Sequence, residues 1–100
     1  MTGDASKHAC GARLTAARKA IHLSQEQLGE KIGISKAAIS NVEKGRSYPG
    51  HNLLLYLHRE HRIDFNFMMH GDYAQLPSDV QASLFEAFAD GEFPADQRPS

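Results

Sequence analysis

The sequence predicts an all-α fold built around one hydrophobic core. Apolar residues recur at helical spacing along most of the chain, and no segment shows the strict alternation of a half-buried strand. Ser or Asp precedes several of these periodic segments and Gly follows them, which is typical of helix starts and stops. The chain has 100 residues, 41% hydrophobic and 23% charged, which favours a single globular domain.

The first helix is predicted from Arg13 to His22. Leu14, Ala17 and Ile21 fall on one face of a 3.6-residue period, and the alanines of this segment favour helix. Residues 1–11 are expected to form an N-terminal arm outside the folded domain.

The second helix is predicted to begin after Ser24. Ser24 is the expected N-cap, and Gln27, three residues later, has the spacing of a capping box. Leu28 and Ile32 supply the buried stripe. Gly33 ends the helix because a tight stop usually needs a residue with positive φ.

The third helix should run from its N-cap Ser35 to Lys44, with Gly45 as its stop. Ala38, Ile39 and Val42 form its apolar side. The opposite side is an exposed stripe of polar or small residues at helical spacing, which comprises Lys36, Ala37, Ser40, Asn41 and Lys44.

The C-terminal half continues with short helices. A loop at residues 46–50 leads to a helix over residues 51–62, and Asp64 caps a shorter one that Gly71 ends. Residues 73–100 form an acidic extension with a helix at about 78–89 and a loose tail after it. One face of that last helix is apolar and comprises Val80, Leu84, Phe85 and Phe88.

Two short helices joined by a tight turn at Gly33 and Ile34 have the form of a helix-turn-helix. In that motif the second helix lies in the DNA major groove while the first crosses the backbone. Ile34, Ile39 and Val42 are expected to lock the two helices at a fixed angle. The exposed stripe of the second helix lacks large apolar groups and is therefore suited to meet base edges.

The same residues carry a family resemblance. The stretch LSQEQLGEKIGISKAAISNVEKGRSYP (23–49) closely resembles the phage repressor and Cro-like helix-turn-helix family, often called the XRE type. The stretch YLHREHRIDFNFMMHGD (56–72) resembles that family's closing helices. The resemblance implies a five-helix lambda-repressor-like DNA-binding domain at residues 12–72, followed here by the additional helix. Gly29 departs from the family, which usually has Ala there, and both residues are small enough for close helix packing.

The family's roles assign specific residues. Base reading is implied for Lys36, Ala37, Ser40 and Asn41, whose side chains suit guanine, thymine methyl and adenine contacts. Phosphate contacts are implied for Gln25, Ser35, Lys44 and Arg46, which position the protein without reading sequence. Similar repressors also join an Arg of the first helix to a Glu near the end of the recognition helix. That pair would be Arg18 and Glu43 here, with a structural role.

The uneven distribution of charge along the chain and the apolar face of its last helix indicate candidate binding partners. Residues 1–62 carry a net charge of +5 and residues 63–100 one of −6, which favours a polyanion partner for the first part. The resemblance implies a transcription regulator, a repressor in the manner of the family, that binds a pseudo-palindromic operator as a homodimer. The acidic segment keeps an alternative open, an antitoxin-like or regulatory module that binds another protein. The apolar face of the last helix can pack on the chain's own fourth and fifth helices or across a dimer axis, and the dimer is the version predicted here. Its interface candidates are Val80, Leu84, Phe85, Phe88, Phe67 and Met68.

Other functional classes find little support. The single cysteine, Cys10, excludes an intrachain disulfide, and the six histidines lack the paired spacings of a zinc site. No nucleophile motif or phosphate-cradling glycine loop is present, so neither an enzyme nor a cofactor is expected. No run approaches the ~20 apolar residues of a membrane span, and residues 1–11 lack the apolar core of a signal peptide. A cytoplasmic protein is therefore expected.

Overall fold

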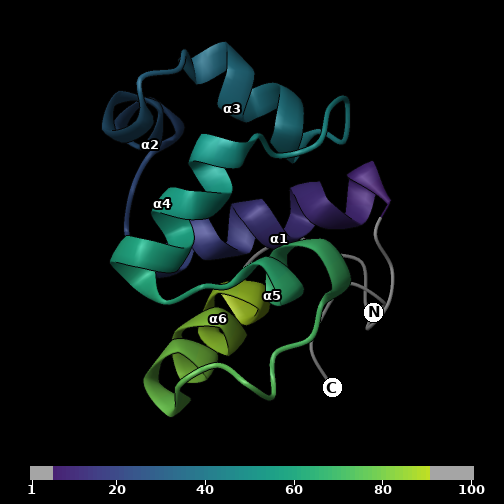
Figure 1. Ribbon diagram of the computed structural model, residues 1–100, viewed down its shortest axis with the longest axis vertical. Coiled ribbons are helices and arrows are strands. Elements are labelled where there is room, and N and C mark those ends of the chain that lie inside the picture. The colour runs from purple at the N-terminus through teal and green to yellow at the C-terminus, as the bar shows by residue number, and fades with distance from the viewer. Residues whose placement is uncertain (1–5, 91–100) are drawn as a thin grey trace.

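Six helices build the part of the chain that the computed structural model describes, residues 6–90 (Figure 1). No strand occurs within this range, in agreement with the predicted all-α class. Residues 1–5 of the predicted arm and 91–100 of the predicted tail lie outside the described residues. The helices are α1 (Lys7–Ala20), α2 (Gln25–Ile32), α3 (Lys36–Glu43), α4 (His51–His61), α5 (Phe65–His70) and α6 (Ser78–Asp90).

The helix boundaries follow local capping chemistry. The Ser24 side chain accepts from the Gln27 amide at 3.0 Å, and the Gln27 side chain accepts from the Ser24 amide at 2.9 Å, which completes the predicted capping box. Gly33 ends α2 in the left-handed conformation, with φ of 76°. Ser35 caps α3 by accepting from the Ala38 amide at 3.1 Å.

The first helix begins earlier than predicted, at Lys7 rather than Arg13. Ser6 caps it by accepting from the Ala9 amide at 3.1 Å. The predicted N-terminal arm is therefore wrong for residues 7–11. These positions are mostly small residues, which give little periodic signal in the sequence, although Ala9 and Cys10 are fully buried.

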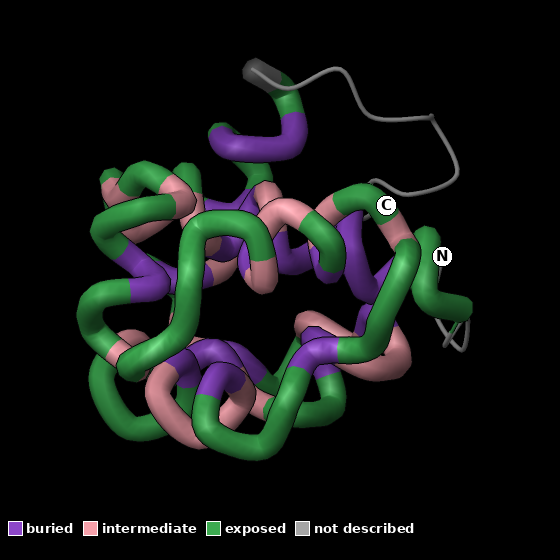
Figure 2. The backbone as a smooth tube through the Cα atoms, turned by 90° about the horizontal axis from the view of Figure 1, so that it is seen from above, coloured by how far each residue is buried: buried purple, intermediate pink, exposed green. Residues whose placement is uncertain are grey.

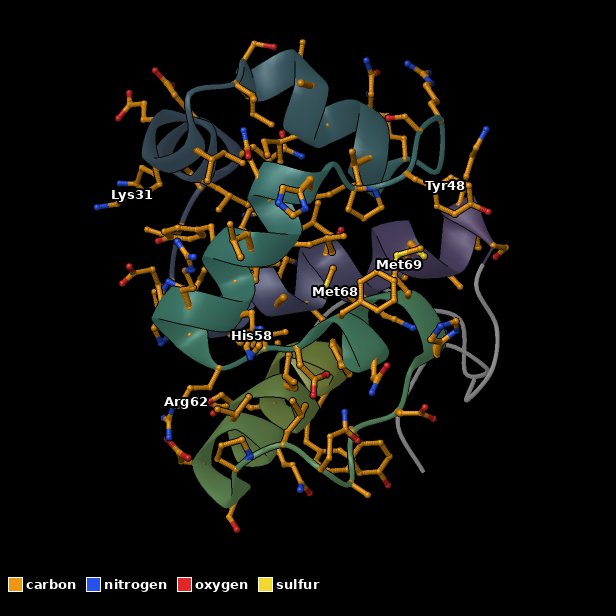
Figure 3. The ribbon with its side chains drawn as sticks, viewed as in Figure 1. Lys31, Tyr48, His58, Arg62, Met68 and Met69 are labelled. Carbon is orange, nitrogen blue, oxygen red and sulfur yellow. The ribbon has the colours of Figure 1, made fainter. Side chains whose placement is uncertain are left out.

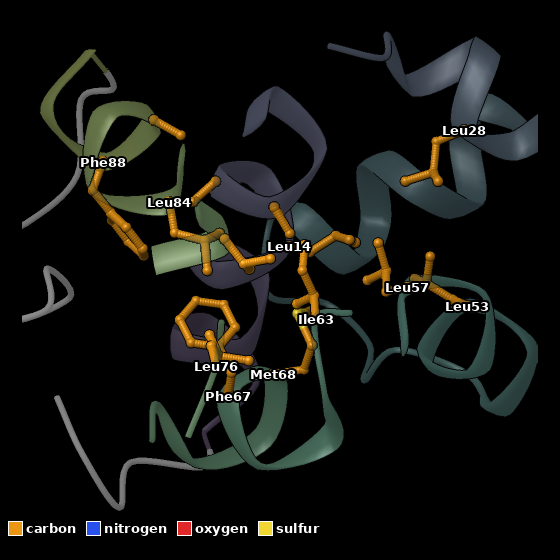
Figure 4. Packing of buried hydrophobic residues seen from close by; sticks show 14 of the residues in the cluster. Leu14, Leu28, Leu53, Leu57, Ile63, Phe67, Met68, Leu76, Leu84 and Phe88 are labelled. Atoms are coloured by element: carbon orange, nitrogen blue, oxygen red, sulfur yellow. The ribbon is translucent and has the colours of Figure 1, made fainter. Parts of the chain in front are cut away.

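The core lies between α1 and the helices that surround it (Figure 4). Helix α1 packs against α3 on one side and against α5 and α6 on the other. Its Leu14 is fully buried together with Phe67 of α5 and Leu84 of α6. Figure 2 shows the buried stretches of the helices turned toward the middle of the molecule and the connecting loops largely exposed. Because α1 contacts both groups of helices, the additional helix α6 belongs to the same core as the predicted DNA-binding domain.

Most of the predicted dimer-interface residues prove to be core residues. Their side chains are buried inside a single chain because α6 folds back on α1, which covers the apolar face that a helix of this length cannot leave exposed. The prediction that they form an interface is therefore wrong for five of the six residues. The five are Val80, Leu84, Phe88, Phe67 and Met68, whereas Phe85 remains 40% exposed.

Arg13 is a buried cation that the sequence reading did not anticipate. It lies on the inner side of α1 with no exposed surface, and its Nη1 donates to the Met68 carbonyl oxygen of α5 at 3.4 Å. A buried charge requires hydrogen-bonding partners, and this contact joins α1 to α5. Nothing in the linear sequence marks this arginine as buried, because the packing of α5 decides its burial.

Candidate nucleic-acid interface

The turn between α2 and α3 is tighter than its sequence suggested. The Ile34 amide donates to the Gly29 carbonyl oxygen at 2.9 Å. A Cβ atom at Gly29 would lie 2.5 Å from the Ile34 carbonyl oxygen, which is closer than real contacts allow. The expectation that an alanine here would be small enough for this packing is therefore wrong, because the loop backbone lies directly on Gly29.

The apolar contacts that fix α3 are partly those expected. Ile39 and Val42 are buried against α1 and α2, with 0% and 6% of their surfaces exposed. Ile34 is 37% exposed, so its side chain contributes less to this packing than the other two, while its backbone amide ties the turn to α2. It lies in the turn itself, where the chain reverses at the surface.

The outer side of α3 is open to solvent. Lys36, Ala37, Asn41 and Lys44 are exposed, and Ser40 is half-buried. All five lie on the side of α3 opposite its buried residues Ile39 and Val42. Figure 1 shows α3 at one end of the long axis of the molecule, with α6 at the other end. The stripe is therefore accessible to a large partner without any rearrangement of the fold.

Asn41 is lightly held by the residue that follows α3. Arg46 donates from Nη1 to the Asn41 Oδ1 at 3.5 Å, at the long limit of a hydrogen bond. A contact this long is easily exchanged for one to a base edge. Ser35 keeps its hydroxyl hydrogen for a second partner, because its oxygen acts as the acceptor in the cap of α3.

Behind the stripe, a polar network joins three helices. Arg18 of α1 pairs with Glu43 of α3 through two hydrogen bonds, Nε to Oε2 at 2.7 Å and Nη2 to Oε1 at 3.2 Å. The side chains are 13% and 7% exposed. Arg18 also donates from Nη1 to the Leu23 carbonyl oxygen at 2.9 Å, and Gln25 of α2 donates to Glu43 Oε1 at 3.1 Å. The network ties the C-terminal end of α3 to α1 and to the start of α2.

Gln25, for which the family resemblance implies a phosphate contact, is part of this network. One hydrogen of the Gln25 amide is used for Glu43, and a side-chain amide has two. The second hydrogen is available to a phosphate at the N-terminal end of α2. Gln25 is half-buried, so its orientation is set by the protein before any ligand arrives.

A close backbone contact with α1, which the sequence did not reveal, fixes the last turn of α3. Gly11 of α1 lies directly against the last turn of α3. A Cβ atom at this position would lie 2.5 Å from the Val42 carbonyl oxygen and 2.7 Å from that of Glu43. The glycine therefore permits a close approach of the two helices, and no motif or periodicity in the sequence signals it.

A groove runs beside α3, between it and the start of α4. It has a volume of about 420 Å³, and its floor is largely apolar. Asn41 lies on its α3 side, and Tyr48, His51 and Asn52 line the opposite side. Tyr48 is 48% exposed and is labelled in Figure 3. The sequence predicts a loop and a helix start for this segment, and only the packing of α4 places it next to the stripe.

Metal and membrane features are not found in the described part of the chain. Within residues 6–90, no three His, Cys, Asp or Glu side chains gather as a metal site would require. None of the helices in this range combines the length and hydrophobicity needed to cross a bilayer.

Comparison with known proteins agrees with this geometry. A family model described as helix-turn-helix matches residues 14–54. The P22 c2 repressor, solved in complex with a synthetic operator, is 32% identical, and the match covers 63% of this chain and 96% of that one with a TM-score of 0.56. This chain belongs to the helix-turn-helix family of phage repressors.

The same P22 repressor also matches as a full-length sequence, and one further solved structure shares the fold. Repressor protein C2 of Salmonella phage P22 is 32% identical over 65 residues, which are 65% of this chain and 30% of that repressor. The clp gene regulator ClgR of Corynebacterium glutamicum shares the fold, with 22% identity, a TM-score of 0.50 and coverage of 83% of this chain and 72% of that one. The helix-turn-helix family model and the P22 repressor describe DNA-binding regulators rather than enzymes, in agreement with the sequence prediction of a non-enzyme.

Proposed function

We propose that this protein is a sequence-specific regulator of transcription, which binds double-stranded DNA by placing α3 in the major groove. The observation that carries the proposal is the exposed polar stripe on α3, on a helix held from behind by the Arg18–Glu43 pair and by Gly11. A rigid helix presents its side chains to base edges at fixed positions, which specific readout requires. The family membership supports the same conclusion.

Each exposed residue of the stripe has a distinct role in this proposal. Asn41 reads adenine through its amide, Lys36 donates to guanine, and Ala37 packs on a thymine methyl group. Ser40, which is half-buried, accepts or donates a hydrogen bond at a base edge. Lys44 and Arg46 bind phosphates together with Ser35 and Gln25, and they add affinity without sequence preference.

The test compares Asn41→Ala with Lys44→Ala on duplexes obtained by selection from random DNA, followed by a panel of single-base changes. The Asn41 variant should lose ~1–3 kcal/mol at one base pair and relax the preference there. The Lys44 variant should weaken every duplex alike. Wild-type protein that binds all duplexes equally would refute sequence-specific recognition.

The proposed regulator binds a pseudo-palindromic operator as a homodimer. Two α3 helices would enter successive major grooves about 34–36 Å apart on one face of the DNA. An interface through α6 does not suit this arrangement, because α6 lies at the opposite end of the molecule from α3 (Figure 1). An interface beside α3 is needed instead.

The face formed by α4 and α5 meets this requirement. Phe65 is 51% exposed and lines a shallow depression of about 180 Å³ with Leu54, Leu55, His51 and His58. His51 also lines the groove beside α3, so the depression adjoins the DNA-reading face. A second copy that buries Phe65 would keep both α3 helices on the same side of the dimer.

Sedimentation across protein concentrations tests this interface. Phe65→Glu should weaken self-association, because burying an unpaired carboxylate is unfavourable. The matched control is Phe85→Glu, an exposed aromatic residue on α6 that should leave self-association unchanged. If the Phe85 variant is the one that dissociates, the dimer axis passes through α6 and the present placement is wrong.

A further inference from the structure

We propose that Lys7 binds a DNA phosphate beside the C-terminal end of α3 and that Tyr48 holds it there. This inference rests on the proposed function and extends it to a residue outside the stretches that resemble the family. The domain that the resemblance implies begins at residue 12, and the family model matches from residue 14. Lys7 is available only because α1 begins earlier than the sequence predicted.

The structure places Lys7 against the loop that follows α3. Its ammonium nitrogen lies 5.6 Å from the centroid of the Tyr48 ring, within the range of a cation–π interaction. Both side chains are exposed. The ring restrains the position of the ammonium group without neutralising it. All three N–H donors of the lysine therefore remain directed to solvent or to an anion.

The backbone beneath Lys7 is fixed to α3. Gly11 lies in close contact with the carbonyl oxygens of Val42 and Glu43. A Cβ atom at Gly45 would lie 3.1 Å from the Cα atom of His8. The start of α1 and the end of α3 therefore form one rigid unit. When α3 enters the major groove, Lys7 is carried to the neighbouring backbone of the DNA.

The charge around Lys7 favours an anion. Lys44, Arg46 and His8 are exposed near the same end of α3. The carboxylate of Glu43 lies at the same end of α3, and it is already paired with Arg18 and hydrogen-bonded by Gln25. The first turn of α1 contains no acidic residue, and the amides at a helix N-terminus add a positive dipole. A phosphate group of the DNA backbone fits this environment.

The experiment measures DNA affinity over a range of salt concentrations for Lys7→Gln. Loss of one phosphate contact per subunit should weaken every duplex by a similar factor and should reduce the slope of log K against log salt by ~0.9 for each bound subunit. Lys7→Arg should keep the wild-type slope because the charge remains. Tyr48→Ala should reduce affinity for all duplexes, whereas Tyr48→Phe keeps the ring and should not.

The matched control is Lys31→Gln, which removes the same charge from a lysine on the other side of the molecule from Tyr48 (Figure 3). If the wild-type protein binds specifically but neither Lys7→Gln nor Lys31→Gln changes the salt slope, the role of Lys7 is overturned and the proposed function remains intact. Wild-type protein that binds no duplex specifically would overturn both. Melting curves of each variant should match the wild type, because both lysines are exposed.

Discussion

Replacement of Gly11 by alanine should destabilise the protein, although helix propensity alone predicts the opposite. Gly11 lies inside α1, where alanine is favoured over glycine by ~1 kcal/mol. The added Cβ would lie 2.5 Å from the Val42 carbonyl oxygen and 2.7 Å from that of Glu43, whereas ordinary contact begins at 3.4 Å. The helices must therefore separate by up to about 0.9 Å, the difference between 2.5 and 3.4 Å.

The size of the effect follows from which atoms clash. Both are backbone atoms of α3, which cannot rotate away as a side chain would. Overpacking of a core contact disfavours the folded state by ~1–3 kcal/mol. After the gain of ~1 kcal/mol in propensity, we expect a net loss of up to ~2 kcal/mol. A loss of 1 kcal/mol lowers the melting temperature of a domain this size by ~4–8 °C.

Thermal melting followed by circular dichroism, together with guanidinium unfolding, measures this loss. Gly50→Ala is the matched control, because a Cβ atom there would meet nothing within 4 Å. DNA affinity should fall further than the loss of folded protein explains, since the displaced element is α3 itself. A Gly11→Ala protein that melts at or above the wild-type temperature would show that the helices adjust without strain and would refute the reasoning.

Three further predictions follow from the core and the polar network. Arg18→Ala should destabilise the fold toward the lower end of ~3–5 kcal/mol, because Glu43 would lose its main partner while 7% exposed, and the double variant with Glu43→Ala should be less destabilised than the sum of the single ones. Phe88→Ala, at a side chain 1% exposed, should lose ~3–5 kcal/mol in guanidinium unfolding, and an effect no larger than that of Phe85→Ala would place α6 outside the core. Burial is the main cause that lowers the pKa of His61, so the unfolded chain takes up a proton first as the pH falls. The free energy of unfolding should therefore decline as the pH drops through ~6.5 and level off below the folded pKa. His61→Gln should flatten this dependence in urea unfolding between pH 8 and 5, and an unchanged slope would contradict the assignment.

The elements that the sequence predicted well are those whose cause is local. Ser24 with Gln27, Ser35 and Gly33 start and stop helices through bonds to residues three or four positions away, so their spacing is legible in the chain. The exposed stripe of α3 is equally local, because helical periodicity alone decides which residues share a face. The family motif spans this same stretch, from which both the fold and the reading side of α3 were predicted.

Tertiary packing decided the rest. The apolar face of α6 was equally suited to a partner chain or to the chain's own core, and only the position of α1 shows that Leu84 and Phe88 are buried internally. The close approach at Gly11 and the burial of Arg13 depend on helices more than 25 residues away, on α3 and α5. Sequence patterns report which surfaces of a helix are apolar, but the element that covers each surface is selected by the packing of the whole chain, since burial is non-directional.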